Sequence, residues 1–293
     1  MKELNIIYTA QAGPTHVTYS SENGKIWFSS GYKENMPNIA MNSYSAVKIG
    51  TNDSLFIAEP MCVLEQNYNI DFANKFKYIF TWATKVFKNT KVEHKVVYVN
   101  FPSYRNNPLI TKENWLAWGD RSNEIVFIAN NKSSPHSTEL YSLRIKLADW
   151  LHANSSLNVS WYGNMPIRRP YYKGNVGSKT DILTKVKFCV CCENSYDPVY
   201  SANFLTEKLP DVWFSGAVPI YMGCSNMNEL GVSENNYIDL LPYKNDFAGL
   251  NNYLLNFSEH NYTAMTENYS SLNNELYRLT AYENMFDIML NVH

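Results

Sequence analysis

The chain has 293 residues, of which 45% are hydrophobic and 18% charged, and its formal net charge is −2. This composition is typical of a globular protein and excludes an intrinsically disordered chain. The length allows two ordinary domains or one large one. We expect no nucleic-acid partner, because binding to a phosphate backbone needs clustered Lys and Arg, and the sequence has no basic stripe.

Five cysteines, an odd number, are present: Cys62, Cys189, Cys191, Cys192 and Cys224. Cys189 and Cys192 form a C-x-x-C, but a zinc site needs a second pair of ligands, and the sequence offers none. We therefore predict reduced core thiols. The amino terminus lacks the apolar region of a signal peptide, and no run of 18 apolar residues occurs. The expected location is the cytoplasm, without a transmembrane segment.

Apolar runs of strand length recur along the chain and predict eight strands. They cover residues 4–9, 54–58, 78–82, 95–100, 124–129, 159–161, 187–192 and 218–222. Helical spacing is clearest over residues 138–153, and a final amphipathic segment, 273–290, is expected to pack back across the protein. Strands that alternate with helices predict an α/β fold with parallel sheets.

Residues 101–123 carry Pro102, Pro108 and Gly119 and show no clean periodicity, so this segment is the predicted domain linker. It divides the chain into an amino-terminal domain of residues 1–118 and a carboxyl-terminal domain of residues 119–293.

The segment from residue 187 to 223 predicts a ligand site. A buried strand is followed by the polar residues 193–195, a loop, and Thr206-Glu207-Lys208, which has the character of a helix start. Thr206 is expected to cap this helix, and Lys208 would lie beside backbone N–H groups that favour an anion. A second apolar strand then closes the segment. This order is typical of a phosphate site at the carboxyl edge of a parallel sheet.

The same residues resemble the signature of the α1,3/α1,4-fucosyltransferases, glycosyltransferase family 10. Typical members read FENS, YVTEK and AGAVPV, and this chain has ENS at 193–195, FLTEKL at 204–209 and SGAVPIYMG at 215–223. Upstream, NVSWYG at 158–163 resembles the family's VDVYG strand end. LFIAEP at 55–60 resembles its ESP or TEPP motif. The resemblance covers about two thirds of the chain, is strongest over 125–255, and points to a soluble member of bacterial or viral type.

The resemblance implies a GT-B fold, in which two Rossmann-like parallel-sheet domains face a cleft. The amino-terminal domain would bind the glycan acceptor and the carboxyl-terminal domain GDP-fucose. The implied reaction is inverting transfer of L-fucose to a glycan hydroxyl, with O3 of N-acetylglucosamine or glucose as the expected atom. Two alternatives stay open. One is a GT-B transferase that uses another GDP-sugar, and the other is a carbohydrate-binding relative without catalysis.

Family positions also suggest the donor site. Arg144 and Lys208 match residues that contact the donor diphosphate, and Glu207 matches a carboxylate that binds the ribose hydroxyls. Asn194 and Ser195 are expected to contact the donor, although they could simply cap a turn. An arbitrary Arg or Lys is more often a solvated surface charge, and the motif context is what favours function here.

Four further residues are candidates with weaker support. Phe204 stands where the family usually has tyrosine, so a hydroxyl contact to the donor is absent here. Tyr162, Gly163 and Glu193 are additional candidates for donor binding. The loop 196–203 is longer than in typical members.

Glu59 is the candidate general base, since it matches the glutamate of the ESP or TEPP motif, and Glu65 is held in reserve. An ordinary strand-end carboxylate is the alternative interpretation of Glu59. The sequence contains no Asp-x-Asp and no His-rich cluster, so we expect no metal and no cofactor, with Arg144 and Lys208 stabilising the leaving diphosphate. The glycine-containing segment 174–180 lacks the order of a phosphate loop and is interpreted as lining the cleft.

Overall fold

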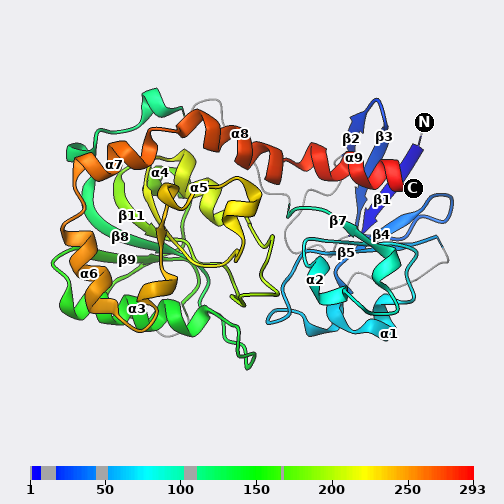
Figure 1. The fold of residues 1–293 in the computed structure, drawn as a ribbon, viewed down its shortest axis with the longest axis horizontal. Coiled ribbons are helices and arrows are strands. Elements are labelled where there is room, and N and C mark those ends of the chain that lie inside the picture. Colours follow the sequence, from blue (N-terminus) through cyan, green and yellow to red (C-terminus); the bar gives the residue numbers. More distant parts are fainter. Residues whose placement is uncertain (1, 8–17, 44–51, 102–110, 166–167) are drawn as a thin grey trace.

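The computed structural model describes residues 2–7, 18–43, 52–101, 111–165 and 168–293. Within these ranges the chain forms two sheets, each flanked by helices, which lie side by side (Figure 1). The first sheet is built from the first third of the chain and the second from the remainder. Both are mostly parallel, so the predicted α/β class is confirmed.

The first sheet has the strand order β2-β3-β1-β4-β5-β6-β7, in which β2 is antiparallel to β3 and the other neighbours are parallel. Its strands are β1 (Lys2–Ile7), β2 (Thr18–Ser21), β3 (Gly24–Ser29), β4 (Asn38–Met41), β5 (Ser54–Ile57), β6 (Ile79–Thr81) and β7 (Val96–Tyr98). Residues alternate between its faces, as strand geometry requires. Leu55 and Ile57 pack toward the short helices α1 (Ile70–Ala73) and α2 (Thr84–Phe87), whereas Phe56 packs on the opposite face.

The second sheet is fully parallel, with the order β10-β9-β8-β11-β12-β13. Its strands are β8 (Ser122–Ile128), β9 (Asn158–Tyr162), β10 (Tyr172–Gly174), β11 (Val186–Val190), β12 (Val218–Tyr221) and β13 (Ile238–Asp239). The helices α3 (Tyr141–Asn154), α4 (Lys179–Leu183) and α5 (Lys208–Phe214) lie between successive strands. The strand order reverses between β8 and β11, and ligands of such sheets bind at the carboxyl edge of this switch point.

Four helices complete the chain: α6 (Phe247–Leu255), α7 (Glu259–Thr266), α8 (Tyr269–Thr280) and α9 (Tyr282–Val292). The predicted final helix is therefore two helices, because Ala281 has an extended backbone between them. Its predicted packing is confirmed, since α9 crosses to the first sheet (Figure 1) and buries Met285, Phe286 and Met289 there. Lys2 Nζ donates to the carbonyl oxygen of Leu290 at 3.0 Å, which ties the two ends of the chain together.

All eight predicted strands are present, with ends within two residues of the prediction where the structure describes them. Residues 8 and 9 of the first predicted strand, and residues 102–110 of the predicted linker, lie outside the described ranges. The later part of that linker belongs to the second core, where Trp118 is buried and stacks on Tyr262 at 5.1 Å between ring centroids. The division into domains 1–118 and 119–293 stays a prediction.

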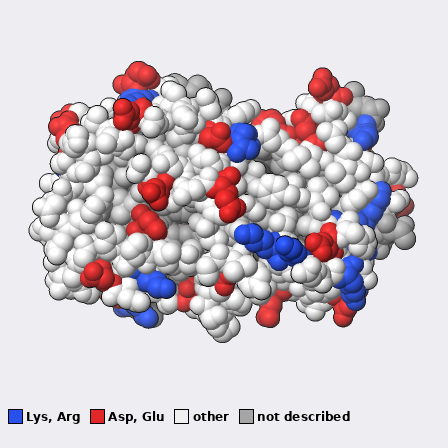
Figure 2. Space-filling view, in the orientation of Figure 1, with Lys and Arg blue, Asp and Glu red and all other residues white. Residues whose placement is uncertain are grey.

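The five cysteines are buried and unpaired, which confirms the prediction of core thiols. On the face shown in Figure 2, acidic and basic side chains are interspersed and not gathered by sign. In the part of the chain that the structure describes, no helix combines the length and apolar character needed to cross a membrane.

Candidate functional site

An open pocket of about 310 Å³ lies at the switch point of the second sheet, at the lower end of the size range of small-molecule sites. Side chains that follow β8 and β11 meet there, together with the start of α5. Five residues predicted from the sequence line the pocket: Arg144, Gly163, Asn194, Glu207 and Lys208.

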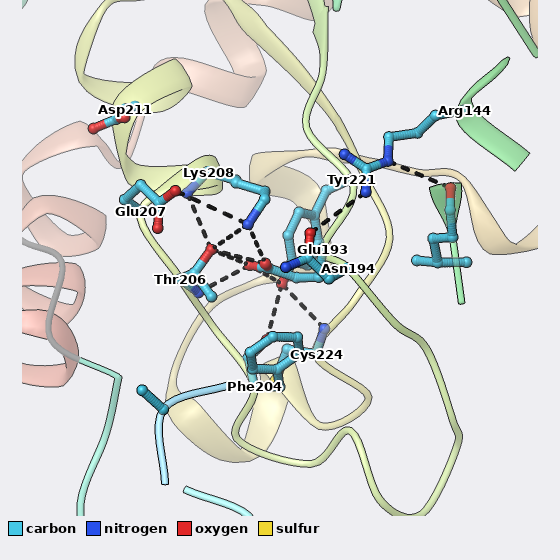
Figure 3. A network of polar contacts seen from close by, with 12 residues as sticks. Arg144, Glu193, Asn194, Phe204, Thr206, Glu207, Lys208, Asp211, Tyr221 and Cys224 are labelled. Carbon is cyan, nitrogen blue, oxygen red and sulfur yellow. Dashed lines mark hydrogen bonds and ion pairs between the residues drawn. The ribbon is translucent and has the colours of Figure 1, made fainter. Parts of the chain in front are cut away.

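Lys208 is held in place by a buried carboxylate (Figure 3). Glu193 has no exposed surface and accepts a hydrogen bond from Lys208 Nζ at 3.0 Å. The same carboxylate accepts the backbone N–H of Thr206 at 2.9 Å and its hydroxyl at 2.7 Å. Glu193 therefore positions the ammonium group of Lys208. The complete burial of Glu193 favours this role over the predicted contact with the donor.

Two residues of the pocket lining, Lys208 and Glu207, keep their charge because oppositely charged groups lie nearby. Burial lowers the pKa of Lys208, but the carboxylates of Glu193 and Glu207 more than offset this effect and raise it above its ordinary value. Burial likewise raises the pKa of Glu207, yet Lys208 and Lys179 bring it below its ordinary value. The pocket therefore presents the charged ammonium group of Lys208 beside the charged carboxylate of Glu207.

Arg144 lies at the end of the first turn of α3 with 3% of its surface exposed. Its Nη2 donates to Asn194 Oδ1 at 3.4 Å, and its Nε donates to the Leu140 carbonyl at 3.4 Å. The guanidinium also lies over the Tyr141 ring, 4.9 Å from its centroid. Burial lowers the pKa of Arg144, but a guanidinium stays charged in proteins. With five N–H donors, it can bind an anion in addition to these contacts.

Glu59 follows β5 of the first sheet and lies outside the lining of the pocket, within electrostatic reach of its charged residues. Asn42 Oδ1 accepts the backbone N–H groups of Ala58 at 3.0 Å and Glu59 at 3.1 Å, and Tyr68 donates to the Glu59 carbonyl at 3.0 Å. Burial raises the pKa of the Glu59 carboxyl, and the charges of Lys132 and Lys208 partly counteract that rise. The structure thus brings the candidate base close to the candidate donor residues.

Phe204 and Thr206 lie outside the lining of the pocket. The ring of Phe204 is 1% exposed and stacks on Trp82 of the first sheet, with 4.3 Å between centroids. Burial of the ring in this core favours a role in joining the two halves over a contact with the donor. The N-cap residue of α5 is Glu207 and not Thr206, whose hydroxyl donates to Glu193 at 2.7 Å and accepts the Lys208 N–H only at 3.5 Å.

The remaining candidates lie around the site. Ser195 is buried and forms an isolated bridge with Glu139, beside the pocket rather than in its lining. Tyr162 is half-buried at the end of β9, and Glu65 is exposed in a 3-10 turn, Glu65–Tyr68. Neither contributes to the lining described above.

The sequence reasoning missed two lysines. Lys132, in the loop after β8, and Lys179, the first residue of α4, both line the pocket. Lys179 forms an ion pair with Asp211 at 2.9 Å. The segment 174–180 does line the cleft, as expected, through Val176 and Lys179. Ser178 caps α4 by accepting the Asp181 N–H, and this Ser-x-x-Asp spacing was the available signal that Lys179 opens a helix.

Comparison with known proteins places these features in a family. Residues 120–279, more than half of the chain, match the family model described as glycosyltransferase family 10 (fucosyltransferase), C-terminal part. No curated protein matches the chain.

Solved structures share its fold. A crystal structure of an α1,3-fucosyltransferase with GDP is 16% identical over 99% of this chain and 90% of its own, with a TM-score of 0.58. One with GDP-fucose is 17% identical over 91% and 80%, with a TM-score of 0.55. TarM is 13% identical over 88% and 54%, with a TM-score of 0.57.

These similarities confirm the predicted GT-B fold, which the two adjacent parallel-sheet units display directly. The family model spans the second sheet, the pocket at its switch point and most of the helices that follow. The chain belongs to glycosyltransferase family 10, the fucosyltransferases.

Proposed function

We propose that this protein transfers L-fucose from GDP-fucose to a glycan hydroxyl, with O3 of N-acetylglucosamine or glucose as the acceptor atom. One observation carries the proposal: Arg144, Glu207 and Lys208 share a pocket, and the charge of Lys208 acts on the carboxyl of Glu59 from the other sheet. The fold is similar to that of α1,3-fucosyltransferases whose structures contain GDP or GDP-fucose, which supports the choice of donor.

Arg144 and Lys208 would bind the diphosphate of the donor. Negative charge grows on this group as the bond to fucose breaks, and fixed cations stabilise that charge without reorganising. Glu193 already holds Lys208, and packing around α3 already holds Arg144. Both cations are therefore placed before the donor binds.

Glu207 would accept hydrogen bonds from the two ribose hydroxyls, because an ionised carboxylate accepts several such bonds. Its lowered pKa keeps it ionised. Asn194 lines the same pocket and already accepts a bond from Arg144, so it would orient the guanidinium and contact the donor with its amide.

Glu59 would take the proton from the acceptor hydroxyl as that oxygen attacks the fucose carbon. A general base works best when its pKa approaches the working pH, and burial moves the pKa of Glu59 in this direction. Attack from the side opposite the diphosphate inverts the configuration at this carbon. In this account residues 1–118 bind the acceptor, residues 119–293 bind the donor, and no metal takes part.

Thermal denaturation with nucleotides tests the proposal. A ligand at one hundred times its dissociation constant stabilises the folded state by about 2.7 kcal/mol. GDP and GDP-fucose should raise the melting temperature, whereas UDP- and CMP-sugars should not. Equal stabilisation and transfer with GDP-mannose would favour the alternative of another GDP-sugar. Binding of GDP-fucose without transfer to any of a panel of lactose, N-acetyllactosamine and monosaccharides would favour the inactive relative.

A further inference from the structure

An apolar band crosses the carboxyl edge of the first sheet. Ile6 pairs with Phe28 on β3, and Met41 pairs with Phe56 on β5. Residues paired across adjacent parallel strands point to the same face of a sheet. These four side chains and Phe286 of α9 belong to one apolar cluster on that face. Phe28 and Met41 are only partly buried by it.

An open cavity of about 260 Å³ lies against this band. Tyr282, Met285 and Phe286 of α9 contribute to its wall, so the helix that returns from the second half covers part of it. Its opposite end reaches Lys179 and Glu207. Both of these residues also line the proposed donor pocket, so the cavity adjoins that pocket.

The described polar side chains of this cavity lie at its donor end and on α9. Among the described residues of its wall, the side chains that form strong hydrogen bonds are Lys179 and Glu207 at the donor end and Tyr282 on α9. No side chain among the described residues of the band offers a hydrogen bond to the hydroxyls of a further sugar unit, and burying hydroxyls unpaired is unfavourable. An alkyl chain or an aromatic ring would bury its surface there at a gain.

We propose that the preferred acceptor is a glycoside with an apolar aglycone, which lies on this band while the sugar reaches the donor end. The inference rests on the proposed transfer of fucose and narrows its acceptor to a chemical class. The sugar then lies at the end of the cavity that is shared with the donor pocket, and the aglycone meets Phe28 and Met41.

The test compares methyl and octyl β-glycosides of one acceptor sugar, below the micelle concentration, with GDP-fucose as donor. A fully buried methylene lowers KM by about fourfold, so partial burial of the octyl chain should lower KM by about tenfold or more. The value of kcat should change little, because the aglycone is remote from the reacting atoms. Equal KM values for the two glycosides would overturn the proposal.

Met41→Gln tests whether the band causes the preference, since Gln has a similar size but is polar. Ile288→Gln is the matched control, because Ile288 lies on the exposed side of α9. Met41→Gln should remove at least about threefold of the octyl preference and leave KM for the methyl glycoside unchanged, whereas Ile288→Gln should preserve the preference. An intact preference in a folded Met41→Gln protein would overturn the proposal.

Equilibrium binding keeps this test separate from that of the proposed function. If neither glycoside receives fucose, the proposed function fails, and calorimetric binding of the two glycosides in the presence of GDP still tests the band. Tighter binding of the octyl glycoside, lost in Met41→Gln and retained in Ile288→Gln, supports the band. Equal affinity for both glycosides contradicts it. If Met41→Gln does not fold, Phe28→Leu replaces it as the test. Leucine is smaller than phenylalanine but also apolar, so this variant should reduce the preference for the octyl glycoside without abolishing it.

Discussion

At the residue scale, the charge of the pocket depends on a carboxylate that solvent does not reach. Glu193 is fully buried and its charge offsets that of Lys208, so this ion pair is neutral as a whole, and Arg144 adds the positive charge that a diphosphate would meet. Removal of Lys208 alone would leave an unpaired carboxylate beneath the ligand. Removal of Arg144 would take away a cation without exposing a carboxylate in this way.

Arg144→Ala and Lys208→Ala should each weaken GDP binding by about ten- to a hundredfold, the usual cost of losing a charge-assisted contact. Lys208→Ala should also lower the free energy of unfolding by several kcal/mol, because it leaves a buried charge unpaired. Combining it with Glu193→Gln should recover part of both losses. Calorimetry and urea denaturation measure these effects. GDP affinity unchanged in both single variants would remove the two cations from the site.

Glu59→Gln should lower kcat by about 10²–10⁴-fold and leave GDP affinity intact, since glutamine keeps the shape but cannot take a proton. The base acts when ionised, and burial raises its pKa above 4.5. The value of kcat/KM should therefore increase with pH as the Glu59 carboxyl loses its proton, at a pH above 4.5. This pH dependence should vanish in Glu59→Gln. Glu65→Gln, at an exposed position, should be nearly silent. An inactive Glu65→Gln variant together with an active Glu59→Gln variant would show that Glu65, and not Glu59, is the base.

At the scale of elements, the last helix of the chain, α9, covers the first sheet. Its buried residues Met285, Phe286 and Met289 pack on Ile6 and other residues of the strands, while Ile288 faces outward. The stability of the first half therefore depends on a helix that follows the second half in the sequence.

Met289→Ala should lower the free energy of unfolding by about 2–5 kcal/mol, because it leaves a cavity at a fully buried position. Ile288→Ala is the control on the same helix and should change stability by no more than about 0.5 kcal/mol. Chemical denaturation of both variants measures the difference. Equal small effects would mean that α9 does not hold the first sheet.

The sequence predicted the elements with continuous apolar runs and missed those without them. Buried parallel strands such as β8 and β11 are apolar on both faces, so their pattern is unambiguous. The hairpin of β2 and β3 has a mixed pattern, and its Asn23-Gly24 turn was the signal that could have revealed it. In the site, motif spacing located Arg144 and Lys208. The inward packing of Phe204 depends on a contact with Trp82, which no local pattern encodes.

At the scale of the whole molecule, one chain of contacts connects the two halves to the candidate base. Trp82 stacks on Phe204 of the second half, and its Nε1 donates to the Ala58 carbonyl at 3.0 Å, next to Glu59. Phe204 lies two residues before Thr206, whose hydroxyl is bonded to Glu193. The contact therefore relates the position of the candidate base to that of the proposed diphosphate site.

Trp82→Phe should retain a ring against Phe204 but lose the hydrogen bond to Ala58. An unpaired buried carbonyl costs about 1–3 kcal/mol of stability. Because the effect falls on the strand end that carries Glu59, kcat should decrease while GDP affinity stays unchanged. Steady-state kinetics and calorimetry separate the two quantities. A loss of GDP affinity with normal kcat would place the effect in the second half instead.

The most direct test of the central claim is an NMR analysis of the product formed from GDP-fucose and N-acetyllactosamine in the presence of EDTA. The account predicts one new fucosyl residue, α-linked to O3 of N-acetylglucosamine, because attack inverts the β-configured donor and no metal is involved. It also predicts that this product is absent when Glu59→Gln replaces the unmodified protein at the same concentration and time. A β-linked product, or activity that EDTA abolishes and Mn²⁺ restores, would contradict the mechanism. GDP-fucose left intact with every acceptor of the panel would contradict the function itself.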